Sequence, residues 1–110
     1  MKLPNPERAV VSEQKLAGYC LNFNHSDGQH KARVFKSALD LDLNDLEEFK
    51  TALLNAVKDY EATADRQNQY GQKYIIDFPL NREDRTATIH SVWIVKNGED
   101  FPCLVTCYVL

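Results

Sequence analysis

Residues 85–110 read RTATIHSVWIVKNGEDFPCLVTCYVL and have the composition of two β-strands. Both of its halves are rich in β-branched and aromatic residues, and Asn97-Gly98 lies between them. An Asn-Gly pair supplies the positive φ angles that tight hairpin turns need, so we predict two antiparallel strands, at 85–95 and 101–110, joined by a turn at 96–100. A third strand is predicted at KYIIDF, residues 73–78, ended by Pro79 and joined to the next strand through 79–84.

The first half of the sequence has the period of helices. Its strongest helical signal is a stripe of apolar residues spaced three or four positions apart: Leu46, Phe49, Leu53, Val57 and Tyr60. Asn44 is the predicted N-cap of this helix, and Glu47 completes a variant of the capping box. Two shorter helices are predicted, one after a Ser12 cap and one over about 30–39, while the polar segment 62–72 is predicted to be a connection.

Helices followed by antiparallel strands predict an α+β fold, with about three N-terminal helices packed on one face of a three- or four-stranded antiparallel sheet. The fourth strand would be a short edge strand at RAVV, residues 8–11. A chain of 110 residues has room for one hydrophobic core, so a single domain spanning 1–110 is expected. The residues expected to be buried are Leu46, Phe49, Leu53, Val57, Trp93 and Val105.

Composition and charge exclude several classes of function. Hydrophobic residues make up 44% of the chain and charged residues 26%, which is typical of a globular protein. The formal net charge of −3 argues against nucleic-acid binding by the surface as a whole, so any site for a polyanion must be local. No apolar run approaches the roughly 20 residues that span a bilayer, and the N-terminus lacks the apolar core of a secretory signal. We expect a cytoplasmic protein that does not bind membranes.

No motif for a nucleotide, a dinucleotide, a hydrolase nucleophile or a zinc protease occurs in the chain, so no cofactor and no metal are expected. His25 and His30 lack the spacing and the cysteine or carboxylate company of a zinc site. The three cysteines, Cys20, Cys103 and Cys107, form no CxxC pair, and the last two lie about 13 Å apart along a predicted strand. They are predicted to be reduced, partly buried thiols.

A concentration of positive charge marks GQHKARVF, residues 28–35, at the start of the second predicted helix. At 100° per residue, Lys31 falls in the middle of the apolar stripe, while His30 and Arg33 fall on one flank. One interpretation is a solvated first turn, from which Lys31 extends past the core into water. The other is a pocket for a phosphate or carboxylate, because a helix N-terminus already favours anions and these three side chains would add charge.

Polar side chains on the predicted strands are the candidate partners of this basic stretch. Ser91 and Thr106 are small hydroxyl residues inside apolar rows, and Tyr108 shares a predicted strand face with Thr106. The two hydroxyls would either bond to backbone groups and water or face a substrate, with Tyr108 as a stacking ring or a proton donor. The period-2 pattern places Asp77 and His90 at exposed strand positions.

The chain as a whole resembles a bacterial domain family with no established function. The likeness is carried by LPNPERAVV, KLAGYCLN, HKARVF, YGQKYIIDF, SVWIV and GEDFPCLVTCYVL, which cover nearly the full length. The order of its elements is in turn similar, at the level of the fold, to barnase/RelE-like ribonuclease toxins. The chain departs from these patterns at Cys103, where the family pattern continues with a basic residue, and in its acidic balance.

The likeness to ribonuclease toxins implies a metal-independent endoribonuclease, the toxin of a toxin–antitoxin pair, with RNA and a small antitoxin as partners. Cleavage would proceed through the RNA 2′-hydroxyl, and the site residues would be three basic helical residues and three strand residues: His30, Lys31, Arg33, Ser91, Thr106 and Tyr108. The alternative is a noncatalytic module that binds another protein or forms homo-oligomers. A cleft joining Lys31 and Arg33 to Ser91 or Thr106 would favour the enzyme, and an exposed apolar strand edge would favour the module.

Overall fold

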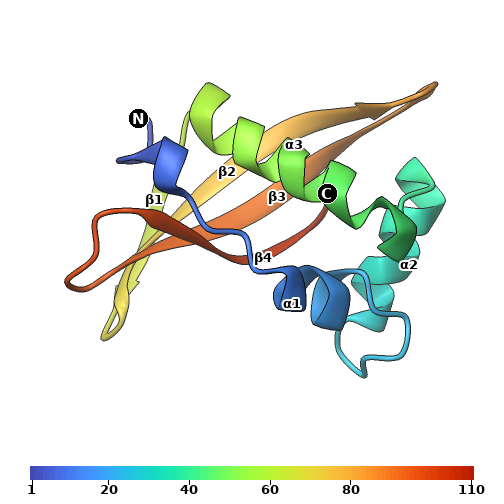
Figure 1. Cartoon of the computed structure of the whole chain (residues 1–110), viewed down its shortest axis with the longest axis horizontal. Helices are drawn as coiled ribbons and strands as arrows, with labels where there is room; N and C mark the ends of the chain where they lie inside the picture. Colours follow the sequence, from blue (N-terminus) through green and yellow to red (C-terminus); the bar gives the residue numbers. More distant parts are fainter.

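The computed structural model describes all 110 residues and has the α+β fold that the sequence predicts (Figure 1). The helices are α1 (Glu13–Lys15), α2 (Gln29–Leu39) and α3 (Leu46–Asp59), and a π-helical segment, Leu16–Cys20, continues α1. The strands are β1 (Thr63–Asn68), β2 (Gly71–Arg82), β3 (Arg85–Lys96) and β4 (Pro102–Val109). Short 3-10 turns, Pro6–Arg8 and Leu43–Asp45, precede α1 and α3.

The four strands form one antiparallel sheet in the order β1-β2-β3-β4, so each strand pairs with its neighbours in the chain. A bulge interrupts the pairing of β3 with β4. Trp93 lies opposite Leu104, and Val92 lies opposite Thr106. Val105 is therefore an extra residue in β4, and the residues that follow it change face relative to those before it.

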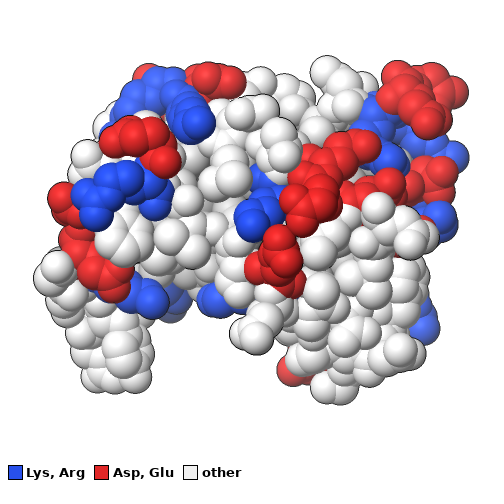
Figure 2. Space-filling model, viewed as in Figure 1, with Lys and Arg blue, Asp and Glu red and all other residues white.

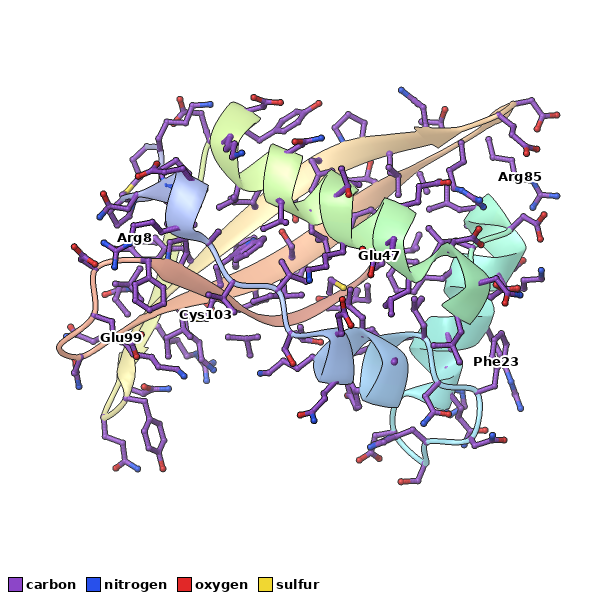
Figure 3. The ribbon with its side chains drawn as sticks, viewed as in Figure 1. Arg8, Phe23, Glu47, Arg85, Glu99 and Cys103 are labelled. Carbon is purple, nitrogen blue, oxygen red and sulfur yellow. The ribbon has the colours of Figure 1, made fainter.

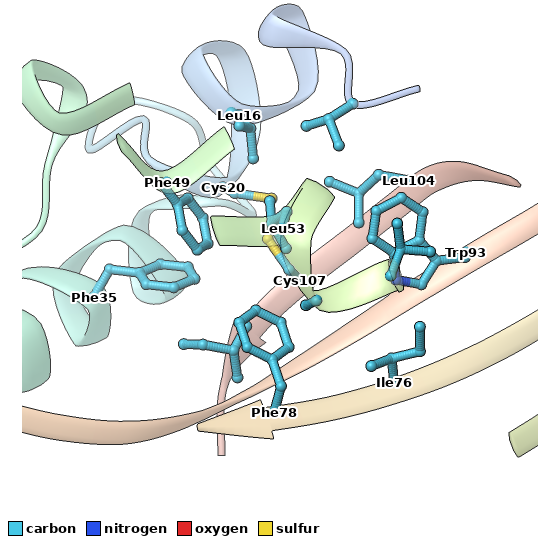
Figure 4. Packing of buried hydrophobic residues seen from close by; sticks show 14 of the residues in the cluster. Leu16, Cys20, Phe35, Phe49, Leu53, Ile76, Phe78, Trp93, Leu104 and Cys107 are labelled. Carbon is cyan, nitrogen blue, oxygen red and sulfur yellow. Dashed lines mark hydrogen bonds between the residues drawn. The ribbon is translucent and has the colours of Figure 1, made fainter. Parts of the chain in front are cut away.

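The hydrophobic core lies between α3, α2 and one face of the sheet (Figures 1 and 4). Its aromatic members include Phe35 of α2, which meets Phe49 of α3 edge to face at 5.0 Å between ring centres. The predicted burial is confirmed for four residues: Phe49, Leu53, Val57 and Trp93. Fully burying an aliphatic or aromatic side chain contributes about 1.5–3 kcal/mol, so α3 is held to the sheet mainly by this stripe.

Two residues of the predicted core, Leu46 and Val105, are less buried than expected. Leu46 begins α3 and is half-buried, and Tyr60, the last residue of the apolar stripe, follows the end of α3 and is 38% exposed. Val105 is half-buried because it sits in the bulge, whereas Leu104 and Cys107 on either side of the bulge enter the core. Strict alternation of buried and exposed residues along β4 would not bury both Leu104 and Cys107, which are three positions apart.

Two strand predictions were wrong. Pro79 does not end the strand at 73–78, because β2 continues to Arg82. The partner strand β1 stops opposite Ile75, so the later part of β2 has a free edge where a residue without an N–H group is tolerated. The segment 62–72 is not only a connection, because it contains β1, whose six residues are all exposed. An edge strand with two exposed faces has no apolar alternation to reveal it.

The N-terminal predictions also need correction. RAVV is not a strand, since it forms only a parallel bridge between Val10 and Cys103. The first helix changes to a π-helix after one turn. Asn44 does not cap α3, because α3 follows Asp45, which makes no side-chain cap bond. A capping box instead begins the preceding 3-10 turn, where the Asp42 carboxylate accepts the Asn44 amide at 2.9 Å and the Asp45 carboxylate accepts the Asp42 amide at 3.1 Å.

Two arginines at the far end of the β2–β3 hairpin tie the sheet to the C-terminal end of α2. Arg82 donates to the Leu39 carbonyl at 2.9 Å and forms an ion pair with Asp45 at 3.0 Å. Arg85, which lies at this end of the hairpin in Figure 3, donates to the Ser37 carbonyl at 3.0 Å. These bonds fix α2 against the sheet, and α2 carries the basic stretch.

Candidate functional site

The N-terminal end of α2 is held by the loop that precedes it. The ring nitrogen Nδ1 of His25 accepts the amides of Asp27 and Gly28, each at 3.0 Å. Gly28 lies so close to the π-helical segment that a Cβ atom there would come within 2.1 Å of the Tyr19 carbonyl oxygen. The sequence of this loop therefore fixes where the first turn of α2 meets the edge of the sheet.

Lys31 points from this first turn toward β4. Its ammonium group donates to the Thr106 hydroxyl at 3.1 Å and to the Tyr19 hydroxyl at 3.3 Å. The same group lies 4.6 Å from the centre of the Tyr19 ring and 5.4 Å from that of Tyr108. No carboxylate forms an ion pair with it. Two hydroxyls and two aromatic faces thus hold a half-buried cation that has no counter-ion.

A pocket of about 280 Å³ opens beside this ammonium group. Its lining comes from α2 and from the end of β4, and consists of His30, Lys31, Val34, Tyr108 and Val109. The walls are largely apolar, with the Lys31 ammonium as the charged group. The pocket therefore suits a flat or apolar group attached to an anion.

Two of the amides at the start of α2 are already used within the protein. Those of Gly28 and Gln29 are bonded to His25, to its ring nitrogen and its carbonyl oxygen respectively. The Lys31 side chain adds a full positive charge at this end of the helix. The Lys31 ammonium is half-buried and lies against the Thr106 hydroxyl.

The structure brings four of the six predicted site residues together: His30, Lys31, Thr106 and Tyr108. Ser91 is fully buried, donates to the Ile76 carbonyl at 2.7 Å and accepts the Trp93 indole N–H at 2.9 Å. Its hydroxyl is a core group, since it faces the side of the sheet that carries α3. Arg33 is exposed and donates only to Gln29, at 3.4 Å, so it does not reach the pocket.

Sequence reasoning missed a histidine–carboxylate pair next to Tyr108. His90 Nδ1 lies 2.7 Å from an Asp77 carboxylate oxygen, and the His90 and Tyr108 ring centres are 4.8 Å apart. The three residues face one another across β2, β3 and β4. Asp77 is exposed, as predicted, while the His90 side chain is only 16% exposed. Only the register in which β2, β3 and β4 pair brings these three residues together, and that register cannot be read from the sequence of any one strand.

A pair of thiols lies behind Thr106. The Cys20 sulfur is 4.0 Å from the Thr106 hydroxyl and 3.7 Å from the Cys107 sulfur, and all three cysteines are free thiols, as predicted. The hydrogen bond that the Cys107 thiol donates lowers the pKa of Cys20 to about 6, and Thr106 and the nearby Lys31 charge act in the same direction. Donating that bond, together with burial, raises the pKa of Cys107.

On the face shown in Figure 2, acidic and basic side chains are interspersed over the helices rather than gathered into one basic area. Many are paired with each other, as Lys36 is with Asp40 at 2.7 Å and Lys50 with Glu13 at 3.2 Å. Lys31 is one of several basic residues without an ion pair, and it differs from the others in lining the pocket.

Comparison with solved structures finds a similar fold. A chain of the contact-dependent growth inhibition toxin–immunity protein complex from Klebsiella pneumoniae 342 superposes with a TM-score of 0.70 and 16% sequence identity. The match covers 92% of this chain and 99% of that one, so the two share a fold over nearly their whole length. No curated protein matches the sequence.

Two further observations bear on identity. The chain contains no helix whose length and apolar character would allow it to span a lipid bilayer. The sequence model of one family, described as a domain of unknown function (DUF6883), matches residues 2–110. Because this match covers nearly the full length, the chain belongs to the DUF6883 family.

Proposed function

We propose that this protein is a metal-independent endoribonuclease that acts as a toxin. The observation that carries the proposal is the Lys31 ammonium, half-buried against Thr106, without a carboxylate partner, at the edge of a pocket. A cation held in this way is ready to bind an anion, because its orientation is already fixed and few of its interactions must be broken.

The chemistry of RNA cleavage matches this arrangement. Attack of the 2′-hydroxyl on the neighbouring phosphate builds up negative charge on the phosphate oxygens in the transition state. A fixed ammonium that faces those oxygens stabilises the transition state more than the ground state. Lys31 is assigned this role, and Thr106 and Tyr19 keep its ammonium in place.

The pocket supports a nucleic acid rather than a small inorganic anion as the ligand. Apart from Lys31, its lining consists of His30, Val34, Tyr108 and Val109. The stacking of a nucleobase on an aromatic ring contributes about 1–3 kcal/mol of binding free energy per base, and every type of base can stack in this way. We assign the pocket to a base next to the phosphate that Lys31 binds.

The alternative function, a noncatalytic interaction module, has less support. It would be favoured by an exposed apolar strand edge, but the exposed edge of the sheet is β1, whose sequence TADRQN is polar. The apolar strand at the opposite edge, β4, is bridged by Val10 and accepts a hydrogen bond from Lys15 at the Val105 carbonyl. The strand that contains YIIDF, β2, pairs with β3 along its length, but on its other side β1 stops opposite Ile75, so a free edge from Ile76 onward is the observation that favours the module.

The fold also supports a protein partner. The solved complex with the similar fold contains a toxin and an immunity protein. We propose by this analogy that a small cognate inhibitor binds this protein and covers the pocket beside Lys31. An inhibitor of that kind would present an acidic side chain to Lys31, since the ammonium lacks a carboxylate of its own.

Regulated expression in a bacterial host tests the proposal. The wild type is expected to stop growth and to leave new RNA ends in a sequencing profile of total RNA. Lys31→Met, which keeps the length of the side chain but removes its charge, is expected to abolish both effects at equal protein level. Lys58→Met is the matched control, because Lys58 lies exposed on the last turn of α3. Normal growth and an unchanged RNA profile with the wild type would contradict the proposal.

A further inference from the structure

A row of three side chains crosses the sheet next to the proposed phosphate site. Asp77 on β2 pairs with His90 on β3, and His90 pairs with Tyr108 on β4. Side chains directly opposite one another in antiparallel strands lie on the same face, so the three form a continuous polar strip. This face is the one opposite to Ser91 and the core.

The geometry of His90 is that of an oriented base. Its Nδ1 bonds to Asp77 at 2.7 Å, and Nε2 is the nitrogen that makes no hydrogen bond with the protein. A carboxylate on one ring nitrogen fixes both the orientation of the imidazole and the position of its proton, and leaves the other nitrogen to exchange a proton. The stacked Tyr108 ring, tilted by 33°, restricts the imidazole from the side of β4.

His90 and Lys31 flank the same phenol ring. The Lys31 ammonium lies 5.4 Å from the centre of the Tyr108 ring, and the His90 ring centre lies 4.8 Å from it. The groups that face His90 from its neighbours are thus Asp77 on β2 and Tyr108 on β4, with Lys31 of α2 beyond the phenol. A nucleotide placed over Tyr108 would have a cation at one side and a base at the other.

We propose that His90 is a catalytic residue that accepts the proton of the RNA 2′-hydroxyl, and that Asp77 is its positioning residue. The inference rests on the proposed ribonuclease function and names the base of that reaction. The 2′-oxygen forms a bond to phosphorus as its proton moves to His90 Nε2. The bond from phosphorus to the 5′-oxygen breaks, and this oxygen takes a proton from water. The products are a 2′,3′-cyclic phosphate and a 5′-hydroxyl, and His90 returns its proton to solvent.

The test uses the purified full chain and a short RNA that it cleaves. Rates are measured between pH 5 and 9 for the wild type, His90→Asn and Asp77→Asn, together with binding of an analogue that carries a 2′-deoxy group at the cleavage site. His90→Asn keeps an amide that can bond to Asp77 but has no base that titrates. Asp65→Asn is the matched control, because Asp65 is an exposed carboxylate on β1 whose side chain makes no hydrogen bond or ion pair.

Loss of a general base typically lowers a rate by about 10²–10⁴-fold. His90→Asn is expected to lower kcat by at least about 100-fold, to remove the acid limb of the pH profile, and to bind the 2′-deoxy analogue within about twofold of wild type. Asp77→Asn is expected to lower kcat about tenfold, to leave KM unchanged and to keep the acid limb, because the imidazole is still present. Asp65→Asn should match the wild type.

The outcomes separate this inference from the ribonuclease proposal. If the wild type cleaves RNA and His90→Asn keeps both its rate and its acid limb, the role of His90 is wrong and the ribonuclease stands. If the wild type cleaves no RNA of any class, the proposed function fails and takes the assignment of His90 with it. Circular dichroism and thermal melts establish that each variant folds, and His90→Gln serves as the second variant if His90→Asn does not.

Discussion

The Lys31 ammonium lies 3.1 Å from the Thr106 hydroxyl, across 75 positions of sequence. This hydrogen bond joins the first turn of α2 to the last strand of the sheet. It exists because the bulge at Val105 turns Thr106 away from the core, where Ser91 points. One extra residue in β4 therefore decides which hydroxyl reaches the cation.

Removal of the Thr106 hydroxyl tests the role of this bond. Thr106→Val keeps the shape of the side chain but leaves the Lys31 ammonium with Tyr19 as its only hydrogen-bond partner. We expect RNA cleavage to fall about tenfold, which corresponds to about 1.4 kcal/mol and is typical of one hydrogen bond to a charged group. The free energy of unfolding should change by less than about 1 kcal/mol, because Thr106 is only half-buried. If Thr106→Val cleaves RNA at the wild-type rate, Thr106 does not contribute to the site.

Glycine at position 28 is predicted to be required by close packing. A Cβ at Gly28 would lie 2.1 Å from the Tyr19 carbonyl oxygen, so Gly28→Ala must shift the loop or the π-helical segment. Overpacking of this kind costs about 1–3 kcal/mol in the free energy of unfolding. Gly18→Ala is the control, since no atom lies within 4 Å of its Cβ position. Equal urea midpoints for the two variants would contradict the predicted contact.

Leu53 is predicted to be a main support of α3. Its side chain is fully buried in the cluster that joins α3 to the sheet. Leu53→Ala should lower the free energy of unfolding by about 2–5 kcal/mol, as large-to-small changes in cores do. Leu54→Ala should cost less, because Leu54 is half-buried on the flank of the same helix. A loss below about 0.5 kcal/mol for Leu53→Ala in urea unfolding would be inconsistent with its place in the core.

The thiol pair predicts a dependence of stability on pH. The pKa of Cys20 is lowered from 9.0 to about 6 in the folded protein, so the native state favours the thiolate more than the unfolded chain does. The unfolded chain then binds more protons between pH 6 and 9, and the free energy of unfolding rises with pH over that window. This contribution is complete above about pH 9 and is lost as the pH falls through about 6.

Urea unfolding under reducing conditions measures this effect as the difference between wild type and Cys20→Ser. The difference is expected to grow by at least about 1 kcal/mol from pH 6 to pH 9, since one pKa unit corresponds to about 1.4 kcal/mol. A difference that stays constant over this range would mean that Cys20 remains a thiol. Cys103→Ser is a suitable control, because burial raises the pKa of Cys103 instead.

The elements that sequence predicts well are those with a strong period or a specific turn. The apolar stripe of α3 and the turn at Asn97-Gly98 each determine their local structure, and the structure has both. The strand β1 has no apolar side to alternate, and the extension of β2 past Pro79 depends on where β1 stops. Both are consequences of strand pairing rather than of local sequence.

The same limit applies to the candidate site. Lys31 stood out because a charge in the middle of an apolar stripe conflicts with the helix pattern, and such conflicts are typical of functional positions. The burial of Ser91 follows from its place on the same face of β3 as Trp93, whereas the bulge at Val105, which period-2 alternation cannot reveal, puts Thr106 on the opposite face. To predict that Asp77 contacts His90, one must know how β2 and β3 are aligned, and the sequence of either strand alone does not determine this alignment.

The proposed role of the Lys31 charge in RNA cleavage is measured by the rates at which purified wild type and Lys31→Met cleave one RNA. Loss of a donor that stabilises a transition state typically lowers kcat by about 10²–10³-fold. We expect a loss of that size for Lys31→Met, with Lys58→Met within about twofold of wild type and both variants folded. Cleavage by Lys31→Met at the wild-type rate would mean that the Lys31 charge plays no part in the reaction.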